Sequence, residues 1–131
     1  MSNIQPKIAL CLIVKDDSEV ESLRRCLNSI AKHVDGIYIT GTKDPQEKIK
    51  ELCAEYGAIW SWFPWTKNFS EARNFNFSQV PKDKFGWQLW CDTDDLWHGA
   101  ENLRNWAKLG IEQNMGAIFA RYLYSVELGE Q

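Results

Sequence analysis

Three aspartates stand within four positions of this chain, Asp92, Asp94 and Asp95, directly after the apolar run 87–91. The run predicts a buried strand, so the acids are expected where that strand leaves the sheet, within reach of water and a ligand. Carboxylates this close repel one another unless a cation lies between them. Oxygen ligands select hard ions such as Mg²⁺ or Mn²⁺, which often take substrate phosphates as further ligands. The pattern therefore indicates a metal that holds a phosphorylated substrate.

A polar turn is the alternative interpretation of the same residues. Asp and Thr are common in turns and at helix N-caps, where their side chains accept hydrogen bonds from backbone amides. The acids between Asp92 and Asp95 would then only shape the backbone. The strands and helices predicted around these acids help to decide between the two interpretations.

Length and composition are those of an ordinary globular domain. The 131 residues, of which 44% are hydrophobic and 25% charged, predict a single domain spanning 1–131. The net charge of −3 gives the chain no general attraction for nucleic acid or for an anionic membrane. Any bound phosphate must therefore be held by local groups, such as a metal ion, an arginine or backbone amides.

The cysteines and the apolar runs indicate a cytoplasmic protein. The longest uninterrupted apolar run, Ile8–Val14, is far too short to span a bilayer, and no basic segment precedes it as in a signal peptide. No two cysteines have C-x-x-C spacing. We therefore expect each cysteine to be a small, buried hydrophobic residue of a protein in a reducing compartment. They are Cys11, Cys26, Cys53 and Cys91.

Strand and helix patterns alternate along the chain. A capping-box pair, Ser18 and Glu21, predicts the start of the first helix, and Asp44 with Pro45 predicts the start of the second, which ends at Gly57. Strands are expected at 8–14, 37–40, 58–63 and 87–91, helices at 18–34, 44–56, 70–78 and 100–110, and one or two further strands within 115–126.

This alternation predicts an α/β fold, a single open and mostly parallel sheet with helices on both faces. Ligands of such sheets bind outside the carboxyl ends of the strands. Three polar clusters are expected at that edge, at 15–17, 40–44 and 92–95. Their coincidence favours a ligand site over a simple turn.

These motifs, taken in order, resemble the N-terminal, nucleotide-sugar-binding half of a family 2 glycosyltransferase with the Rossmann-like GT-A fold, or a minimal version truncated after the D-x-D region. The resemblance runs from about Lys7 to Asp95, and its last two blocks are the most specific. The matching blocks are I-V-K-D-D at 13–17, L-R-R-C-L-N-S-I at 23–30, V-D-G-I at 34–37, W-T-K-N-F-S-E-A-R-N-F at 65–75 and W-Q-L-W-C-D-T-D-D at 87–95.

The resemblance implies transfer of a sugar from a nucleotide donor, most often a UDP-sugar such as UDP-glucose, to a carbohydrate or other hydroxyl acceptor. It implies that Asp92 and Asp94 hold Mn²⁺ or Mg²⁺. A surface salt bridge is the alternative role for Arg73, which matches an arginine near the base and phosphates. The nucleotide-binding residues that it implies are Ile13, Val14, Lys15, Arg73, Asp92 and Thr93.

One departure from the family concerns the base. The family branch has D-T-G-S-T-D after its second strand, and the first Asp of that motif recognises the base. This chain has T-G-T-K-D at 40–44, which lacks that Asp, so its base selectivity is open. Thr40 or Thr42 could supply a weaker hydrogen bond.

The second departure concerns the catalytic base. Family members are considerably longer, and their acceptor half contributes an acid that deprotonates the acceptor hydroxyl. In this chain the candidates are Asp95, Glu101 and His98, the last by its pKa near neutrality. A homo-oligomer could also complete the acceptor site across an interface.

Two other interpretations of the sequence remain. The chain could be a non-catalytic nucleotide- or sugar-binding module, or a fragment of a longer transferase. A phosphatase of the haloacid-dehalogenase type also carries D-x-D after a buried strand. That family places the motif on its first strand, whereas here at least three strands precede it.

Overall fold

The computed structural model describes residues 7–43 and 46–112. The strands are β1 (Ile8–Val14), β2 (Gly36–Gly41), β3 (Ile59–Trp62) and β4 (Trp87–Trp90). The α-helices are α1 (Val20–Ile30), α2 (Glu47–Tyr56), α3 (Phe69–Ser78) and α4 (Leu103–Glu112). Three short 3₁₀ turns accompany them, η1 (Asp17–Glu19), η2 (Ala31–His33) and η3 (Ala100–Asn102). The strands expected within 115–126 lie outside the described residues.

The four strands form one parallel sheet in the order β3-β2-β1-β4. β1 is central, and its Leu10 lies opposite Ile37 of β2 and Leu89 of β4. Helices α1 and α2 make the crossovers that parallel neighbours require. All four strands therefore end at the same edge, as the alternating pattern predicted.

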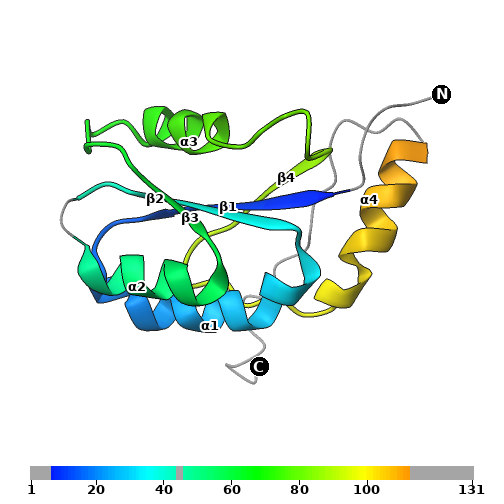
Figure 1. Cartoon of the computed structure of the whole chain (residues 1–131), viewed down its shortest axis with the longest axis horizontal. Helices are drawn as coiled ribbons and strands as arrows, with labels where there is room; N and C mark the ends of the chain where they lie inside the picture. The colour runs from blue at the N-terminus through cyan, green and yellow to red at the C-terminus, as the bar shows by residue number, and fades with distance from the viewer. Residues whose placement is uncertain (1–6, 44–45, 113–131) are drawn as a thin grey trace, which may run out of the picture.

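Helices cover both faces of the sheet (Figure 1), with α3 on one side and α1 and α2 on the other. The residues of β1 divide between these faces because successive side chains of a strand point in opposite directions. Leu10 and Leu12 belong to the larger core cluster, which includes α1 and α2, whereas Ala9 and Cys11 belong to a smaller cluster with Tyr38. Burial on both faces explains why the run of β1 is apolar without interruption.

The first helix begins differently from the prediction. The carboxylate of Asp16 accepts the backbone amide of Ser18 at 2.9 Å and caps η1, and α1 follows only from Val20. The capping box of Ser18 and Glu21 is therefore wrong, because Asp16 is an equally suitable acceptor placed closer to the strand end. The regular helix stops at Ile30, and η2 continues to His33, one residue short of the predicted end at 34.

The start of α2 is held by an acid from another element. Asp17 accepts the amides of Ile49 at 3.1 Å and Lys48 at 3.3 Å, so its carboxylate stands at the positive end of the helix dipole. The predicted cap at 44–45 lies outside the described residues. At the other end Gly57 adopts a left-handed conformation with φ of 67°, which confirms the predicted stop.

Helix α4 lies beside the amino ends of the strands, away from the edge where they terminate (Figure 1). Arg104 of α4 forms two hydrogen bonds with the Asp35 carboxylate, of 2.8 and 3.0 Å. Asp35 also accepts the amide of Ile8 at 2.8 Å. The indole of Trp87 donates to the Ala107 carbonyl at 3.1 Å. These bonds fasten α4 to the starts of β1, β2 and β4.

All four cysteines are buried and free, in agreement with their prediction as small core residues. Two of them, Cys26 of α1 and Cys91 after β4, share a hydrogen bond between their sulfur atoms at 3.7 Å and form no disulfide. None of the helices in the described residues combines the length and the apolar character that a membrane span needs.

Candidate donor site

A cavity of about 700 Å³ opens at the carboxyl edge of the sheet. Its walls include Lys15 after β1, Thr42 after β2 and Asp92 after β4. The connections after β1 and β2 build the sheet in one direction, whereas β4 joins the other side of β1. The cavity therefore lies at the point where the strand order reverses, the usual ligand crevice of open α/β sheets.

The acidic residues converge at one end of this cavity. Asp92, Asp94 and Asp95 each offer a carboxylate oxygen within 4.8 Å of the others. The Asp95 carboxylate accepts the amide of Asp92 at 2.9 Å, and the Asp95 amide donates to the Asp92 carbonyl at 3.1 Å, so the acids sit on a tight turn. Burial, followed by the charges of Asp95 and Asp94, raises the pKa of Asp92. A hard divalent cation fits this set of oxygens and would relieve the repulsion.

Glu19 braces the two sides of the cavity. Its carboxylate accepts the Thr93 hydroxyl at 2.6 Å and the backbone amide of Lys15 at 2.5 Å. Thr93 is buried, while Glu19 itself lines the cavity. The sequence offered no signal for this role, because a glutamate at a helix start is expected there for the helix dipole alone.

Arg73 stands beside the acids, between two aromatic rings. Its guanidinium carbon lies 3.8 Å from the ring centre of Trp90 and 4.7 Å from that of Phe69. Burial raises the pKa of Asp92, and the charge of Arg73 acts in the opposite direction. The Arg73 Nε is buried without a hydrogen-bond partner, and no carboxylate of the described residues forms a salt bridge with this side chain. The Arg73 guanidinium is thus a cation that lies against aromatic rings and has N–H donors left for a ligand.

The opposite end of the cavity is formed by residues after β2 and β3. Thr42 lines it and donates its amide to the Val14 carbonyl at 3.1 Å. Lys43 also lines it, with its ammonium 3.7 Å from the Asp16 carboxylate. Trp65 adds a ring that is 48% exposed. This end therefore combines positive charge with an aromatic face.

Most of the residues predicted for the site line this one cavity, namely Ile13, Lys15, Asp92, Thr93 and Asp94. Val14 does not line it, because its side chain is fully buried in the main core and only its carbonyl faces the next loop. Arg73 does not line it either, and lies behind Phe69, which does. Of the two threonines considered for the base, Thr42 lines the cavity. Thr40 is buried and bonded to Asn76 and Ser61 instead.

The three candidates for a catalytic base lie outside the lining of the cavity. His98 and Glu101 are exposed and do not line the cavity. Asp95 does not line it either, but belongs to the acidic turn, where it joins the two predicted metal ligands. Sequence reasoning also assigned no role to Phe69 and Trp65, although both fall in a quoted motif. Their partial exposure, which only the structure reveals, is the signal that it lacked.

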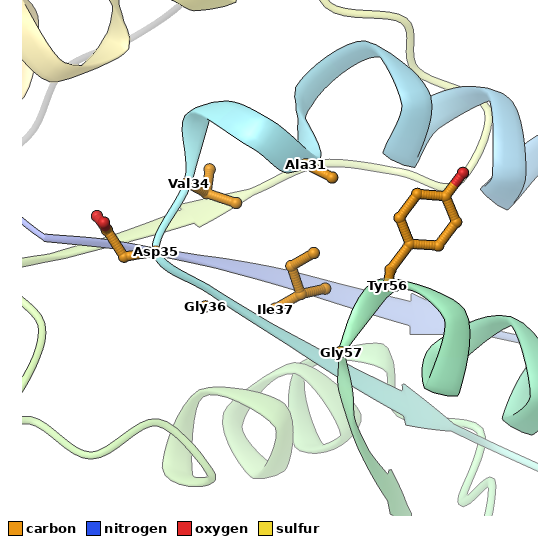
Figure 2. A pocket seen from close by; sticks show the side chains of 7 residues that line it. All are labelled: Ala31, Val34, Asp35, Gly36, Ile37, Tyr56 and Gly57. Atoms are coloured by element: carbon orange, nitrogen blue, oxygen red, sulfur yellow. The ribbon is translucent and has the colours of Figure 1, made fainter.

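A smaller cavity of about 110 Å³ lies at the opposite, amino edge, between η2 and the end of α2. Figure 2 shows its polar side chains, Asp35 and Tyr56, on opposite sides of Ile37 with their oxygens pointing apart. The Asp35 carboxylate is taken by Ile8 and Arg104, and the Tyr56 hydroxyl donates to Asn28. This cavity is therefore poorly equipped to bind a polar ligand.

No family model and no curated protein matches the chain. Among solved structures, residues 1–349 of S. aureus TarS match with a TM-score of 0.65 and 16% identity over 95% of this chain and 40% of that one. The same protein in complex with UDP matches with a TM-score of 0.59 and 17% identity, with the same coverage. The chain thus spans about two fifths of the length of these proteins.

Sequence identities of 16% and 17% support a shared fold and nothing beyond it. The likeness extends over nearly the whole chain and agrees with the parallel sheet and its switch-point cavity. It confirms, at the level of architecture, the resemblance inferred from the motifs. The chain therefore has a GT-A-like fold, the architecture in which S. aureus TarS is built.

Proposed function

We propose that this chain binds the diphosphate of a nucleotide sugar, with a UDP-sugar such as UDP-glucose as the expected donor, together with Mn²⁺ or Mg²⁺. The sugar would pass to a carbohydrate or other hydroxyl acceptor. One observation carries the proposal. Three converging carboxylates and an arginine without a carboxylate partner among the described residues stand side by side at the switch point of the sheet.

The carboxylates supply the ligands that a divalent ion needs. Asp92 and Asp94 would hold it, and Asp95 is close enough to take part. A bound Mn²⁺ or Mg²⁺ would act as a Lewis acid toward the charge that develops on a nucleoside diphosphate leaving group. The repulsion among the acids makes the protein itself favour a cation at this point.

Arg73 and Lys15 supply positive charge to the phosphates. The guanidinium presents a planar fork of donors, the geometry best suited to phosphate oxygens. The Trp90 and Phe69 rings lie against the guanidinium and hold it in place beside Asp92. The existence of a UDP complex of S. aureus TarS, a protein of the same architecture, supports UDP as the first nucleotide to try.

A non-catalytic donor-binding module is the second candidate, and one observation favours it. Neither His98 nor Glu101 lines the cavity, and the Asp95 carboxylate already accepts the Asp92 amide. The described residues therefore bring no evident general base to the acceptor side. In that case the chain would bind the donor and leave acceptor activation to another polypeptide segment.

Calorimetric titration tests the donor site. UDP-glucose is titrated into the wild type and Asp94→Ala, each with and without Mn²⁺. Asp83→Ala is the matched control, because it removes an exposed aspartate far from the acidic turn. We expect binding that needs Mn²⁺, is lost in Asp94→Ala and survives in Asp83→Ala. Equal binding by both variants, or none in any condition, would contradict the proposal.

Turnover separates the two candidates. Release of UDP from UDP-glucose, with water or an added sugar as acceptor, is followed in the wild type, Asp95→Asn, Glu101→Gln and His98→Gln. Release that falls in one of these variants while donor affinity stays constant would identify the base and favour the transferase. Binding without release in the wild type would favour the module.

A further inference from the structure

Two thiols lie directly against the acidic turn, and the donor site as proposed above makes no use of them. Cys91 follows the last residue of β4 and immediately precedes Asp92. Its sulfur shares a hydrogen bond of 3.7 Å with the sulfur of Cys26, in the middle of α1. The Cys26 thiol also donates to the Asp92 carbonyl at 3.8 Å. Two oxidisable side chains are therefore in contact with the backbone that carries the predicted metal ligands.

Cys26 is the fixed member of this pair. Its backbone belongs to the regular helix α1, and the Ser29 hydroxyl donates to the Cys26 carbonyl at 2.6 Å. The same hydroxyl accepts the amide of Trp97 at 3.1 Å, so α1 also supports the chain beyond the acidic turn. The Cys26 side chain is fully buried in the main core. Packing and helix hydrogen bonds thus keep this sulfur in place.

Cys91 is the member with room to move. The pairing of β4 with β1 ends at Trp90, which lies opposite Cys11, so Cys91 stands one residue beyond the paired strand. A disulfide bond is about 2 Å long, and the two sulfurs would have to approach by roughly 1.7 Å to form one. Because Asp92 is the next residue, this movement is transmitted to the acidic turn.

A metal site tolerates such a movement poorly. The carboxylate oxygens of Asp92, Asp94 and Asp95 lie within 4.8 Å of one another, and Thr93 between them is bonded to Glu19. Mg²⁺ requires near-ideal octahedral geometry, with its oxygen ligands about 2.1 Å away. A shift of Asp92 while Thr93 stays tied to Glu19 would disturb the arrangement of oxygens that the ion needs.

We propose that Cys26 and Cys91 form a reversible disulfide bond under peroxide, and that this bond lowers the affinity of the acidic turn for its divalent cation. The inference concerns the regulation of the site proposed above and rests on that function. By linkage, a cation that holds the turn in place opposes formation of the bond. Oxidation of the thiols thus weakens the donor site, and the bound metal protects the thiols.

One molecule of hydrogen peroxide balances the oxidation. The Cys91 sulfur attacks one peroxide oxygen, the O–O bond breaks, and a sulfenic acid forms while the thiol proton leaves in water. The Cys26 sulfur then attacks the sulfenic sulfur, the S–O bond breaks, and the second thiol proton leaves with the hydroxyl as water. The two sulfurs lose two electrons, which reduce the peroxide. Both thiols are buried, so the reaction proceeds through local opening of the turn after β4.

Peroxide treatment followed by peptide mapping tests the bond. The wild type, Cys26→Ala and Cys53→Ala are oxidised without metal and with Mg²⁺, which is redox-inactive. Cys53→Ala is the matched control, because Cys53 is 2% exposed like Cys91 but lies in α2. We expect a bond between Cys26 and Cys91 in the wild type and in Cys53→Ala. It should form about tenfold more slowly when Mg²⁺ stands at ten times its dissociation constant.

Calorimetry of the oxidised and reduced proteins tests the consequence. Each is titrated with UDP-glucose in the presence of Mg²⁺, once the peroxide has been removed. We expect the bond to weaken metal-dependent binding about ten- to a hundredfold, the range found when groups that support metal ligands are altered. Dithiothreitol should restore the affinity of the wild type, a reversal that needs no variant. Cys26→Ala, once thermal unfolding shows that it is folded, should keep its affinity after peroxide.

Two results overturn the inference while leaving the proposed function intact. One is a reduced protein that binds UDP-glucose with Mg²⁺ but forms no bond between Cys26 and Cys91 under peroxide. The other is a bond that leaves the affinity unchanged, or a loss of affinity after peroxide that is equally large in Cys26→Ala. Absence of metal-dependent binding by the reduced wild type overturns the proposed function and its regulation together, whether or not the bond forms.

Discussion

The hydroxyl of Thr93 donates to the carboxylate of Glu19 at 2.6 Å, and this bond links the acidic turn after β4 to the first turn of helix after β1. The same carboxylate accepts the Lys15 amide, so one side chain joins both strand ends that border the cavity. The spacing of the acids from the end of β1 therefore depends on a side-chain bond as well as on strand pairing.

Loss of this brace should weaken both the fold and the site. Thr93→Val keeps the shape of the side chain but removes its donor, and we expect about 1–2 kcal/mol less stability in urea unfolding, together with weaker Mn²⁺-dependent UDP binding. Thr66→Val is the control, since its bond to Glu71 is exposed and should matter less. A double-mutant cycle of Thr93→Val with Glu19→Gln should give coupling of roughly 1 kcal/mol. Additive effects would rule out the brace.

Arg73 should act on the phosphates alone. Arg73→Lys keeps the charge but loses the planar fork and its stacking on Trp90, so UDP affinity should fall by about 1–3 kcal/mol. Affinity for uridine, which has no phosphate, should stay unchanged. Trp90→Leu should give a smaller loss of the same kind. Equal losses for UDP and uridine would mean that Arg73 contacts the nucleoside.

The pair formed by Asp35 and Arg104 should make stability depend on acid pH. Burial alone would raise the pKa of Asp35, but hydrogen bonds from Arg104 and Ile8 outweigh it and hold the pKa below the ordinary value of an aspartate. A folded-state pKa below the unfolded one contributes stability above about pH 4, which is lost as the pH falls through the folded value.

Comparison of the wild type with Asp35→Asn checks this sign. In urea titrations the variant should be about 1–3 kcal/mol less stable at neutral pH. The difference should shrink as the pH falls below about 4, because the protonated wild-type carboxyl then resembles the amide. A difference that stays constant down to pH 2, at about its neutral value, would show that packing rather than ionisation is responsible.

Gly41 should not tolerate a side chain. A Cβ at this position would lie 2.0 Å from the ring of Trp60 and 2.7 Å from the Gln46 amide, so Gly41→Ala should destabilise the fold by about 1–3 kcal/mol. Adding Trp60→Leu should recover part of that loss by opening space. Gly57→Ala has open space and should cost only about 1 kcal/mol, for its left-handed backbone. Failure of Trp60→Leu to rescue would point away from a steric cause.

Local signals predicted the parts of this molecule that depend on neighbours in the chain. Strand β1 was predicted at its observed bounds, because a run buried on both faces leaves no polar break. The acidic turn was recognisable because its three carboxylates stand within four positions of the sequence. The start of α1 was missed because Asp16 and Ser18 both suit a cap, and only the geometry after β1 selects between them.

Roles that depend on distant partners could not be predicted. Glu19 becomes a brace only because β4 brings Thr93 to it from far along the chain. Lys43 and Trp65 face one cavity because β2 and β3 end at the same edge. Nothing in the spacing of these residues distinguishes them from ordinary loop positions.

The strand order has a consequence for how the site comes into being. β1, β2 and β3 are joined by consecutive helical crossovers, whereas β4 must find the free side of β1 after most of the chain has been made. Pairings between distant segments form slowly, because a long loop has to close first. We expect the three-stranded half to assemble early and the acidic turn to take its place last, so that metal affinity appears only when folding is complete.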